Sequence, residues 1–397
     1  MTAAPGRIVL VSHSREVGGA ELHLERLAGY AAGQLTPAYV VEVVCRTDPV
    51  LDAWATRMTA AGVVVHRVGL AGPLDVGRML RTLGGARLVH LHIAHPVGKY
   101  QWTAAFIARV TRRRALATHH LALDIRGLAL GERSRGIWFT AFRLMLRWIH
   151  RHIAVSAYAK RILSGIYGVD PERISVIYVG TDPYRFAPAG AEERSGLRRQ
   201  LFAGLAGIPP SVDVNLVCCV ARLSPQKGLY DLLAAARLLK PDLPSARFVV
   251  IGDGELRAAL SKEVVQAGLA ETVWLAGDQP PSEVARWLQA ADLFVLPSHF
   301  EGGPATALVE AMAAGCAVIA TRVSGSDELI PDPEYGVLVE PRAPDALAAA
   351  IRRLLLDPQL RARLGVRGRE RVVSGFDIRT CNAQTVQLYR SILAGAR

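Results

Sequence analysis

The sequence predicts an α/β protein made of two doubly wound domains that face one another across a cleft. Two observations carry this prediction. Short apolar runs alternate with longer amphipathic segments in each half of the chain, and a polar stretch rich in Gly, Pro and Arg separates the halves. Strands that alternate with helices form parallel sheets, because each helix carries the chain back to start the next strand. A length of 397 residues is enough for two domains of ordinary size.

The first half, residues 1–187, is predicted to form one domain. Its apolar runs have the length of buried strands, and each is followed by a longer segment with helical spacing. The pattern breaks after Tyr178, and the polar stretch 188–211 is predicted to link the domains. The predicted strands are Arg7–Ser12, Val40–Cys45, Val63–Val68, Leu88–Leu91, Ala115–Thr118 and His152–Val155.

The second half repeats this pattern and predicts a second domain over residues 212–376. A last amphipathic segment, residues 377–397, is predicted to be a helix that packs back on the first domain. Ligands of doubly wound sheets bind beyond the carboxyl ends of the strands, so the loops at those ends are the candidate sites. The predicted strands are Val214–Val220, Arg247–Ile251, Val273–Ala276, Leu293–Pro297, Ala317–Ala320 and Val337–Val339.

Composition excludes several classes of protein. Hydrophobic residues make up 51% of the chain and charged residues 21%, which argues against disordered and collagen-like chains. Every apolar stretch is interrupted well short of the ~18 residues that a spanning helix needs. The first residues begin a strand pattern rather than a signal peptide. We therefore expect a cytoplasmic protein.

The cysteine pattern and the charge distribution limit which sites and which partners are expected. The five cysteines are scattered without a Cys-x-x-Cys pair, so neither a disulfide framework nor a zinc site is expected. Residues 1–190 contain 24 Lys and Arg against 12 Asp and Glu, whereas the remainder contains 23 of each. A basic surface confined to one domain attracts anionic partners to that domain. Because no nucleic-acid-binding motif accompanies it, we expect a membrane surface or a phosphorylated acceptor, and no nucleic acid.

Two glycines follow the first predicted strand and precede a helix. Without Cβ atoms, Gly18 and Gly19 would let backbone N–H groups approach an anion at the positive end of that helix. A tight strand-to-helix turn uses the same residue types. The pattern alone leaves both interpretations open.

Two cations, Arg222 and Lys227, lie on the loop after the first strand of the second half. An Arg fork and a Lys point charge could together grip a diphosphate, while solvated surface charge is the alternative. Further on, Gly252 and Gly254 form a strand-to-glycine turn that would let a base or ribose lie close to the backbone. The full dinucleotide-binding pattern is absent, which disfavours hydride transfer.

Two carboxylates, Glu301 and Glu310, follow a later strand, one in the loop and one in the first turns of the next helix. Both can point into the same crevice. A carboxylate there can accept hydrogen bonds from the paired hydroxyls of a ribose or a sugar. For Glu310 the alternative is an acid that stabilises a helix N-terminus.

Taken together, in this order and at these spacings, the motifs resemble glycosyltransferase family 4 over nearly the whole chain. The resemblance implies a GT-B fold of two Rossmann-like domains, a UDP- or GDP-sugar as donor substrate, a hydroxyl acceptor and retention of anomeric configuration. It implies neither a cofactor nor a metal ion. The motifs are Gly18-Gly19-Ala20-Glu21, Arg222 with Lys227-Gly228, Gly252-Asp253-Gly254, and Glu301-Gly302 with Glu310-Ala311-Met312-Ala313.

The resemblance also implies roles for single residues. Arg222 and Lys227 become the clamp that stabilises the departing diphosphate, Glu310 binds the ribose, and Glu301 lies near the donor sugar. Eight residues separate the two glutamates, whereas the family usually has seven, and Ala221 stands where many relatives have Gly. The implied donor-binding set is Gly18, Gly19, Arg222, Lys227, Gly252, Gly254, Glu301, Gly302, Gly303, Leu308, Val309 and Glu310.

The family also places a histidine near the 6-hydroxyl of the donor sugar, commonly as Thr-x-His. Here a predicted strand of the first domain ends in His119-His120, and the match favours His120 as the catalytic residue with His119 as the alternative. Three further histidines, His90, His92 and His95, cluster at another strand end. We expect them to be polar loop or acceptor-site residues rather than metal ligands.

Two mechanisms fit a retaining transferase. In the first, the diphosphate leaves and the acceptor enters on the same face while a phosphate oxygen takes its proton. In the second, Glu301 is the nucleophile of a double displacement. Two other functions also stay open: a GT-B epimerase, which would need acid and base carboxylates in the first domain, and a non-catalytic sugar-nucleotide-binding protein.

The segment Gly136–Ile153 is helical in pattern, aromatic and basic. Such a helix could lie on the anionic inner face of the plasma membrane and present a lipid-linked acceptor, as for cell-surface polysaccharides. An ordinary crossover helix packed on the sheet is the alternative. The predicted membrane contacts are Trp138, Arg143, Arg147, Trp148 and Arg151.

Overall fold

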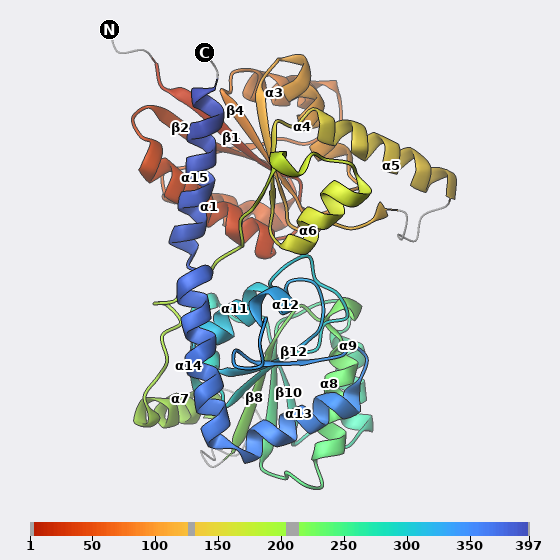
Figure 1. Ribbon diagram of the computed structural model, residues 1–397, viewed down its shortest axis with the longest axis vertical. Coiled ribbons are helices and arrows are strands. Elements are labelled where there is room, and N and C mark those ends of the chain that lie inside the picture. Colours follow the sequence, from red (N-terminus) through yellow and green to blue (C-terminus); the bar gives the residue numbers. More distant parts are fainter. Residues whose placement is uncertain (1–3, 126–131, 204–213, 396–397) are drawn as a thin grey trace. The chain divides into compact units, whose positions relative to one another are not determined.

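The structure is a computed structural model that describes residues 4–125, 132–203 and 214–395. The chain divides into two compact units, drawn in Figure 1. Unit 1 consists of Met1–Val179 and Arg379–Arg397, and unit 2 of Gly180–Ile378. Each unit is built around a parallel sheet, as the alternation of strands and helices predicts.

In unit 1 the described residues form a seven-stranded parallel sheet in the order β3-β2-β1-β4-β5-β6-β7. The strands are rich in Val, Ile, Leu and Ala and are covered on both faces, which is typical of parallel sheets. Six strands coincide with the predicted ones, and β7 is an additional short strand. The strands are β1 (Gly6–Ser12), β2 (Tyr39–Cys45), β3 (Val64–Arg67), β4 (Leu88–Ile93), β5 (Arg114–His119), β6 (Arg151–Ala154) and β7 (Ile174–Val176).

Helices cover both faces of this sheet because alternate strand residues point to opposite sides. Val9 and Val11 join a core with α3, α4 and α5, whereas Ile8 and Leu10 join a second core with α1, α2 and α15. The helices are α1 (Gly19–Leu35), α2 (Asp52–Ala60), α3 (Pro73–Gly84), α4 (Lys99–Val110), α5 (Glu132–Arg147), α6 (Ala157–Arg161) and α15 (Ile378–Ala394).

In unit 2 the described residues form a six-stranded parallel sheet in the order β10-β9-β8-β11-β12-β13. Its strands are β8 (Asn215–Val220), β9 (Ala246–Ile251), β10 (Val273–Gly277), β11 (Leu293–Leu296), β12 (Ala317–Thr321) and β13 (Val337–Val339). Its helices are α7 (Ala191–Ala203), α8 (Leu229–Leu239), α9 (Arg257–Gln266), α10 (Pro281–Ala290), α11 (Thr306–Ala313), α12 (Ser326–Leu329), α13 (Pro344–Leu356) and α14 (Pro358–Gly375).

The division between the units differs from the predicted boundary at 187/188. Thr181 forms an isolated parallel bridge with Asp377, and its amide donates to Phe376 O at 3.0 Å, so the chain enters unit 2 directly after Val179. Part of the predicted link is helical, because α7 packs on α10. Residues 204–211 of that link lie outside the described part of the chain.

The last helix, α15, belongs to unit 1 (dark blue in Figure 1). Its Tyr389 is fully buried, and the phenol lies 2.6 Å from His90 Nδ1 on β4. Val386 and Ile392 are buried in the same core. The core of unit 1 is therefore completed by residues from the end of the chain.

Candidate active site

The sheet of unit 2 reverses its strand order between β8 and β11. Strand β9, which follows β8 in the sequence, lies on one side of β8, and β11 lies on the other side. The connections that leave β8 and β11 therefore run in opposite directions. Such a switch point leaves a crevice at the carboxyl end of an open α/β sheet, where ligands bind. The loop after β8 carries Arg222 and Lys227, and the loop after β11 carries Glu301.

Lys227 and Glu301 form an ion pair across this switch point. Lys227 Nζ lies 2.5 Å from Glu301 Oε1, and the hydroxyl of Ser298 donates to the same oxygen at 2.6 Å. Gln226 Nε2 lies 3.5 Å from the other carboxylate oxygen. The carboxylate of Glu301 is therefore fixed by donors from both loops, with only 8% of its side chain exposed.

The two loops are locked together by their backbones. Gly228 has a φ of +62°, and a Cβ at this position would overlap the carbonyl oxygen of Pro297, so only glycine fits the close approach. The amide of His299 donates to Gln226 O at 2.7 Å, and its Nε2 lies 2.9 Å from Asp231 Oδ2 on α8. Lys227 is thus held at a fixed place relative to Glu301.

The glycine turn after β9 supports the other cation. A Cβ at Gly252 would overlap the carbonyl of Ala221, and one at Gly254 would overlap the backbone of Leu223. The amide of Leu223 also donates to Asp253 O at 2.9 Å. The Cβ positions of these glycines thus face the loop that carries Arg222, and the predicted contact with a base or ribose stays a prediction.

The backbone after Glu301 is held from β12 and the turn that follows it. The hydroxyl of Ser324 donates to the carbonyl of Glu301, and a Cβ at Gly325 would overlap the backbone of Gly303. Gly302 and Gly303 are themselves buried. Gly302 and Gly303, which are predicted to bind the donor, therefore lie in a packed turn.

Helix α11 carries Glu310, Leu308 and Val309. Glu310 is half-buried in the second turn of the helix, so it is not an acid at the N-terminus. The side chains of Leu308 and Val309 are fully buried, and both amides donate to the carbonyl of Ala305. The side chains of Leu308 and Val309 therefore belong to the core, and the predicted donor-binding role of these residues stays a prediction.

In unit 1 the strand order reverses between β1 and β4, and the glycine loop after β1 lies at this switch point. Gly18 is the N-cap of α1 and Gly19 its first residue. The Gly18 amide donates to the carboxylate of Glu21 at 3.1 Å, and Ser12 donates to the same carboxylate. Burial of Glu21 raises the pKa of its carboxyl.

Histidines gather at the same switch point. His120 follows β5, and its Nε2 lies 3.0 Å from Nδ1 of His92 on β4. The ring of His23, on α1, lies 5.5 Å from that of His120 and 5.9 Å from that of His92. His90 instead bonds Thr118 and is part of the core.

The structure separates the two alternative catalytic histidines. His119 is 1% exposed, with its Nε2 3.1 Å from His152 Nδ1 and its ring against Phe142. His120 is half-buried beside His23 and His92. His119 is therefore a core residue, and His120 is the one placed at the switch point.

Burial keeps these imidazoles neutral. It lowers the pKa of His23 to about 4 and those of His90 and His119 to about 3. Burial also lowers the pKa values of His92 and His120 well below the usual range, with neighbouring histidines adding to the effect. Among the described residues, no group of three or more His, Cys, Asp or Glu side chains has the arrangement of a metal site.

The predicted membrane contacts lie on and after α5, which projects from the edge of unit 1 in Figure 1. Arg143 and Arg147 are exposed, whereas Trp138 and Trp148 are half-buried against the core. Arg151 lies on β6 and donates to the carbonyl of Glu172. In the described ranges no helix combines the length and apolarity needed to cross a bilayer.

Some site residues were not predicted from the sequence. Ser298, Gln226 and Ser324 all bond Glu301 or its backbone, and His92 bonds His120. A polar residue immediately after a buried strand is the signal that could have identified Ser298. Ser324 lies in a different loop, and only the folded structure brings it to Glu301.

Comparison with known proteins agrees with this architecture. Two family models match: "Glycosyltransferase Family 4" over residues 17–185 and "Glycosyl transferases group 1" over residues 207–371. The structure of Anabaena HepE in complex with UDP aligns with a TM-score of 0.82 and 22% identity, over 97% of this chain and 100% of that one. Two parallel, doubly wound units of this kind define the GT-B fold.

Relatives in sequence identify the family. The D-inositol 3-phosphate glycosyltransferase of Thermomonospora curvata is 34% identical over 77% of this chain and 75% of its own length. The GDP-mannose-dependent alpha-(1-6)-phosphatidylinositol monomannoside mannosyltransferase of Mycolicibacterium smegmatis is 27% identical over 81% and 74%. The match to the Segniliparus rotundus D-inositol 3-phosphate glycosyltransferase spans only 44% of that protein. The chain belongs to glycosyltransferase family 4.

Proposed function

We propose that this chain transfers a sugar from a nucleotide-diphosphate sugar to a hydroxyl acceptor, with retention of configuration. The observation that carries the proposal is the Lys227–Glu301 pair at the β8/β11 switch point, 2.5 Å apart and joined by Ser298. The solved structures of HepE with UDP and with UDP-glucose, and the name of the GDP-mannose-dependent relative, support a nucleotide sugar as donor.

The leaving group in such a transfer is a nucleoside diphosphate. As the bond between the anomeric carbon and the phosphate oxygen breaks, the electron pair goes to the diphosphate, whose charge Arg222 and Lys227 stabilise. These two cations are the reason that we propose a reaction without a metal ion or cofactor. Full activity in the presence of EDTA would support that part, and activity restored only by a divalent cation would contradict it.

Retention is proposed to occur on one face of the sugar. The acceptor oxygen bonds to the anomeric carbon on the side that the diphosphate leaves, and the acceptor proton passes to the departing phosphate oxygen. We assign Glu301 a positioning role rather than that of nucleophile, because Lys227 and Ser298 bond its Oε1 and Gln226 Nε2 lies 3.5 Å from its Oε2. Detection of a covalent glycosyl adduct on Glu301 would overturn this mechanism.

The remaining residues have proposed positioning roles. Glu310 binds the ribose hydroxyls, the Gly18–Gly19 backbone approaches the phosphates, and His120 contacts the donor sugar. His120 is a neutral group that can donate or accept a hydrogen bond, because its pKa is lowered well below the usual range.

A thermal-shift screen of UDP-, GDP- and ADP-sugars tests the donor. Ligand at 100 times its dissociation constant stabilises the folded state by about 2.7 kcal/mol, so one nucleotide should raise the melting temperature most. Product analysis with and without an acceptor then tests the reaction. Sugar transfer only with acceptor supports a transferase, whereas an epimerised donor without acceptor would contradict it.

We further propose that the acceptor is lipid-linked and that unit 1 binds a membrane surface through α4 and α5. Exposed apolar side chains lie on these helices: Phe106 (44% exposed), Val110 (54%), Ile137 (63%) and Leu144 (44%). Trp102 stacks on Phe106 and meets Trp148 edge-on, which adds an aromatic surface of the kind found at membrane interfaces.

Flotation with liposomes tests this proposal. Wild-type protein should float with vesicles that contain phosphatidylglycerol and less with phosphatidylcholine alone. The variant Ile137→Ser/Leu144→Ser should lose most of this binding. The control Val366→Ser/Val373→Ser changes two equally exposed apolar residues of unit 2 and should bind normally. Equal flotation of the two variants would contradict the proposed surface.

A further inference from the structure

A second concave site lies in unit 1, at the opposite edge of the sheet from His120. It is a pocket of about 470 Å³ at the amino ends of β5, β6 and β7. Its walls come from the end of α4, from the turn before β5, from residues 147–150 before β6, and from the turn before β7. The lining residues are Arg109, Arg112, Arg113, Arg147, Trp148, Ile149, His150 and Arg173.

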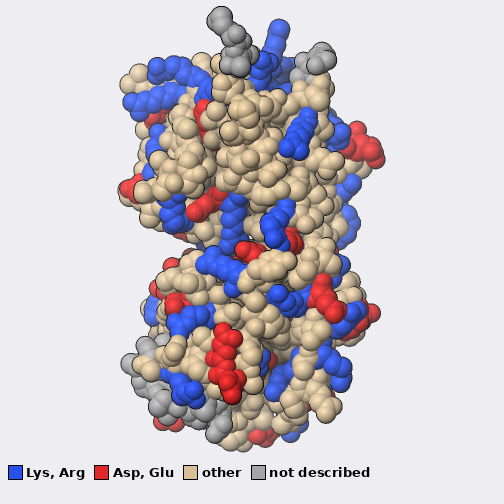
Figure 2. Space-filling view, turned by 90° about the vertical axis from the view of Figure 1, so that its left-hand side faces the viewer, with Lys and Arg blue, Asp and Glu red and all other residues tan. Residues whose placement is uncertain are grey.

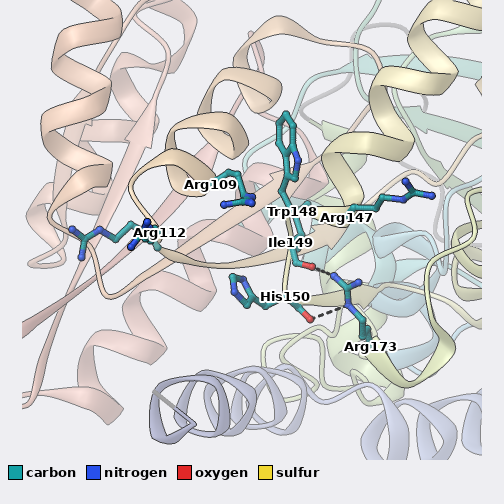
Figure 3. Close-up of a pocket in the computed structure, with 8 residues that line it drawn as sticks. Arg109, Arg112, Arg147, Trp148, Ile149, His150 and Arg173 are labelled. Carbon is teal, nitrogen blue, oxygen red and sulfur yellow. Dashed lines mark hydrogen bonds between the residues drawn. The ribbon is translucent and has the colours of Figure 1, made fainter. Parts of the chain in front are cut away.

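The pocket is lined by cations and contains no carboxylate. Arg109, Arg112, Arg113 and Arg147 have no Asp or Glu oxygen within 4 Å among the residues that the structure describes. Elsewhere in unit 1, arginines such as Arg57 pair with an acid, here Glu25 at 3.0 Å. Five arginines thus line one pocket without a carboxylate among the lining residues. Arg109, Arg112 and Arg147 are exposed and Arg147 extends away from the others in Figure 3, so an anion in the pocket would attract mobile side chains rather than fill a preformed cage.

Three acceptors that line the pocket, two carbonyls and one imidazole nitrogen, are already bonded to protein donors. Arg173 is fixed by its bonds to the carbonyls of Ile149 and His150, drawn as dashed lines in Figure 3. The Nε of Arg113 is buried without a hydrogen-bond partner. His150 Nδ1 accepts from the amide of Ala115 at 3.1 Å, so the proton of the neutral ring is on Nε2. A ligand here must supply acceptors and negative charge.

The backbone at Arg112 is also unusual. It closes the C-terminus of α4 with a φ of +56°, a conformation in which glycine is preferred. The amide of Arg113 donates to Ala108 O at 2.7 Å, which completes the cap. An arginine is thus placed beside the pocket where a residue without a side chain would be more stable.

We propose that this pocket binds a phosphate group that carries two or more negative charges. Guanidinium forks match the oxygens of a phosphate, and several can share one dianion, whereas a single carboxylate would satisfy only one or two of them. The pocket exceeds the volume of one phosphate, so it admits a phosphate ester or a diphosphate. The phosphate belongs either to a soluble metabolite or to a lipid headgroup.

This inference is independent of the donor site. The charge balance of the chain agrees with it, because unit 1 holds 26 Lys and Arg against 11 Asp and Glu, and unit 2 holds 21 against 24. Pockets at the amino ends of parallel strands lie away from the usual reaction site of an α/β sheet. Occupation of this pocket would therefore act on binding or regulation rather than on chemistry.

Calorimetric titration with pyrophosphate at fixed ionic strength tests the proposal. The variant Arg109→Gln/Arg113→Gln should weaken binding at least tenfold. The control Arg78→Gln/Arg81→Gln removes the same charge from exposed positions on α3 and should stay within twofold of wild type. Equal loss in both variants, or no saturable binding by wild type, would overturn the proposal.

Two further experiments are needed. One distinguishes binding at the pocket from binding at the donor site, and the other distinguishes a soluble phosphate from a lipid headgroup. In Arg222→Gln, binding that is still sensitive to Arg109 and Arg113 belongs to the pocket, whatever the fate of the donor site. Glycerol 3-phosphate and vesicles with phosphatidic acid are then compared. Binding of both points to a soluble phosphate ester, and binding of vesicles alone points to a lipid headgroup. Binding of neither, together with no effect of the pocket variant on pyrophosphate, would refute the site.

Discussion

The ammonium of Lys227 lies 2.5 Å from a carboxylate oxygen of Glu301, although 74 residues separate them in the chain. The two side chains come from loops that follow adjacent strands, β8 and β11. Their contact joins a predicted diphosphate ligand to a residue predicted to lie near the donor sugar. The pair therefore couples two parts of the proposed donor site.

Replacement of Lys227 by Met should cost both stability and activity. Glu301 would stay buried without its cation, which is expected to cost about 1–3 kcal/mol of unfolding free energy. Sugar transfer should fall by about 100-fold or more, because the diphosphate loses a stabilising charge. The double variant Lys227→Met/Glu301→Gln should regain stability but not transfer. Recovery of transfer in the double variant would show that Lys227 serves only to neutralise Glu301.

Gly228→Ala should displace the loop that carries Lys227. The matched control is Gly268→Ala, which has a similar φ, +65° against +62°, but open space at the Cβ position. Both substitutions carry the left-handed backbone cost of about 1 kcal/mol. Only Gly228→Ala adds overlap with Pro297 O, so it should unfold at lower urea concentration and lose donor binding. Equal behaviour of the two variants would contradict the close approach.

Substitution of His119 should mainly affect stability, whereas substitution of His120 should mainly affect the transfer rate. His120→Asn should lower the transfer rate with a smaller change in melting temperature than His119→Asn, since His120 is half-buried and His119 is fully buried. His119→Asn should lower the melting temperature, because it removes a buried ring packed on His152 and Phe142, and leave the rate per folded molecule unchanged. The reverse pattern would make His119 the catalytic residue.

Unit 1 should lose stability as the pH falls below 6.5. Burial lowers the pKa of His90 and His119 to about 3 and that of His23 to about 4, whereas the unfolded chain titrates near 6.5. Between these values the unfolded chain binds protons that the folded one does not. Each such histidine therefore costs about 1.4 kcal/mol at pH 5.5. Urea unfolding between pH 7 and 5 measures the effect.

A variant provides the control for this pH dependence. His119→Gln should show a shallower fall in unfolding free energy, by about one proton in slope, whatever its stability at pH 7. The raised pKa of Glu21 acts in the opposite direction. A stability that does not change between pH 7 and 5 would mean that the histidines are protonated in the folded state.

The fold could be predicted from the sequence because its signals are local. A buried strand such as β8 needs only a run of apolar residues, and the loops at strand ends follow from it. The Lys227–Glu301 contact could not be predicted, because it depends on which strands are neighbours. The contact of Gly252 with the backbone of Ala221 could not be predicted either, because a close approach to a ligand and one to backbone require the same residue type.

The core of unit 1 contains Tyr389 and Val386, which lie within the last dozen residues of the chain. During synthesis, unit 2 is complete in sequence before these residues leave the ribosome. Of the two units, unit 1 is therefore the last that can close its core, and until α15 is made one face of its sheet is covered by α1 and α2 alone. Truncation of the C-terminus would leave a translated but unfinished amino-terminal half, exposed to proteases and chaperones.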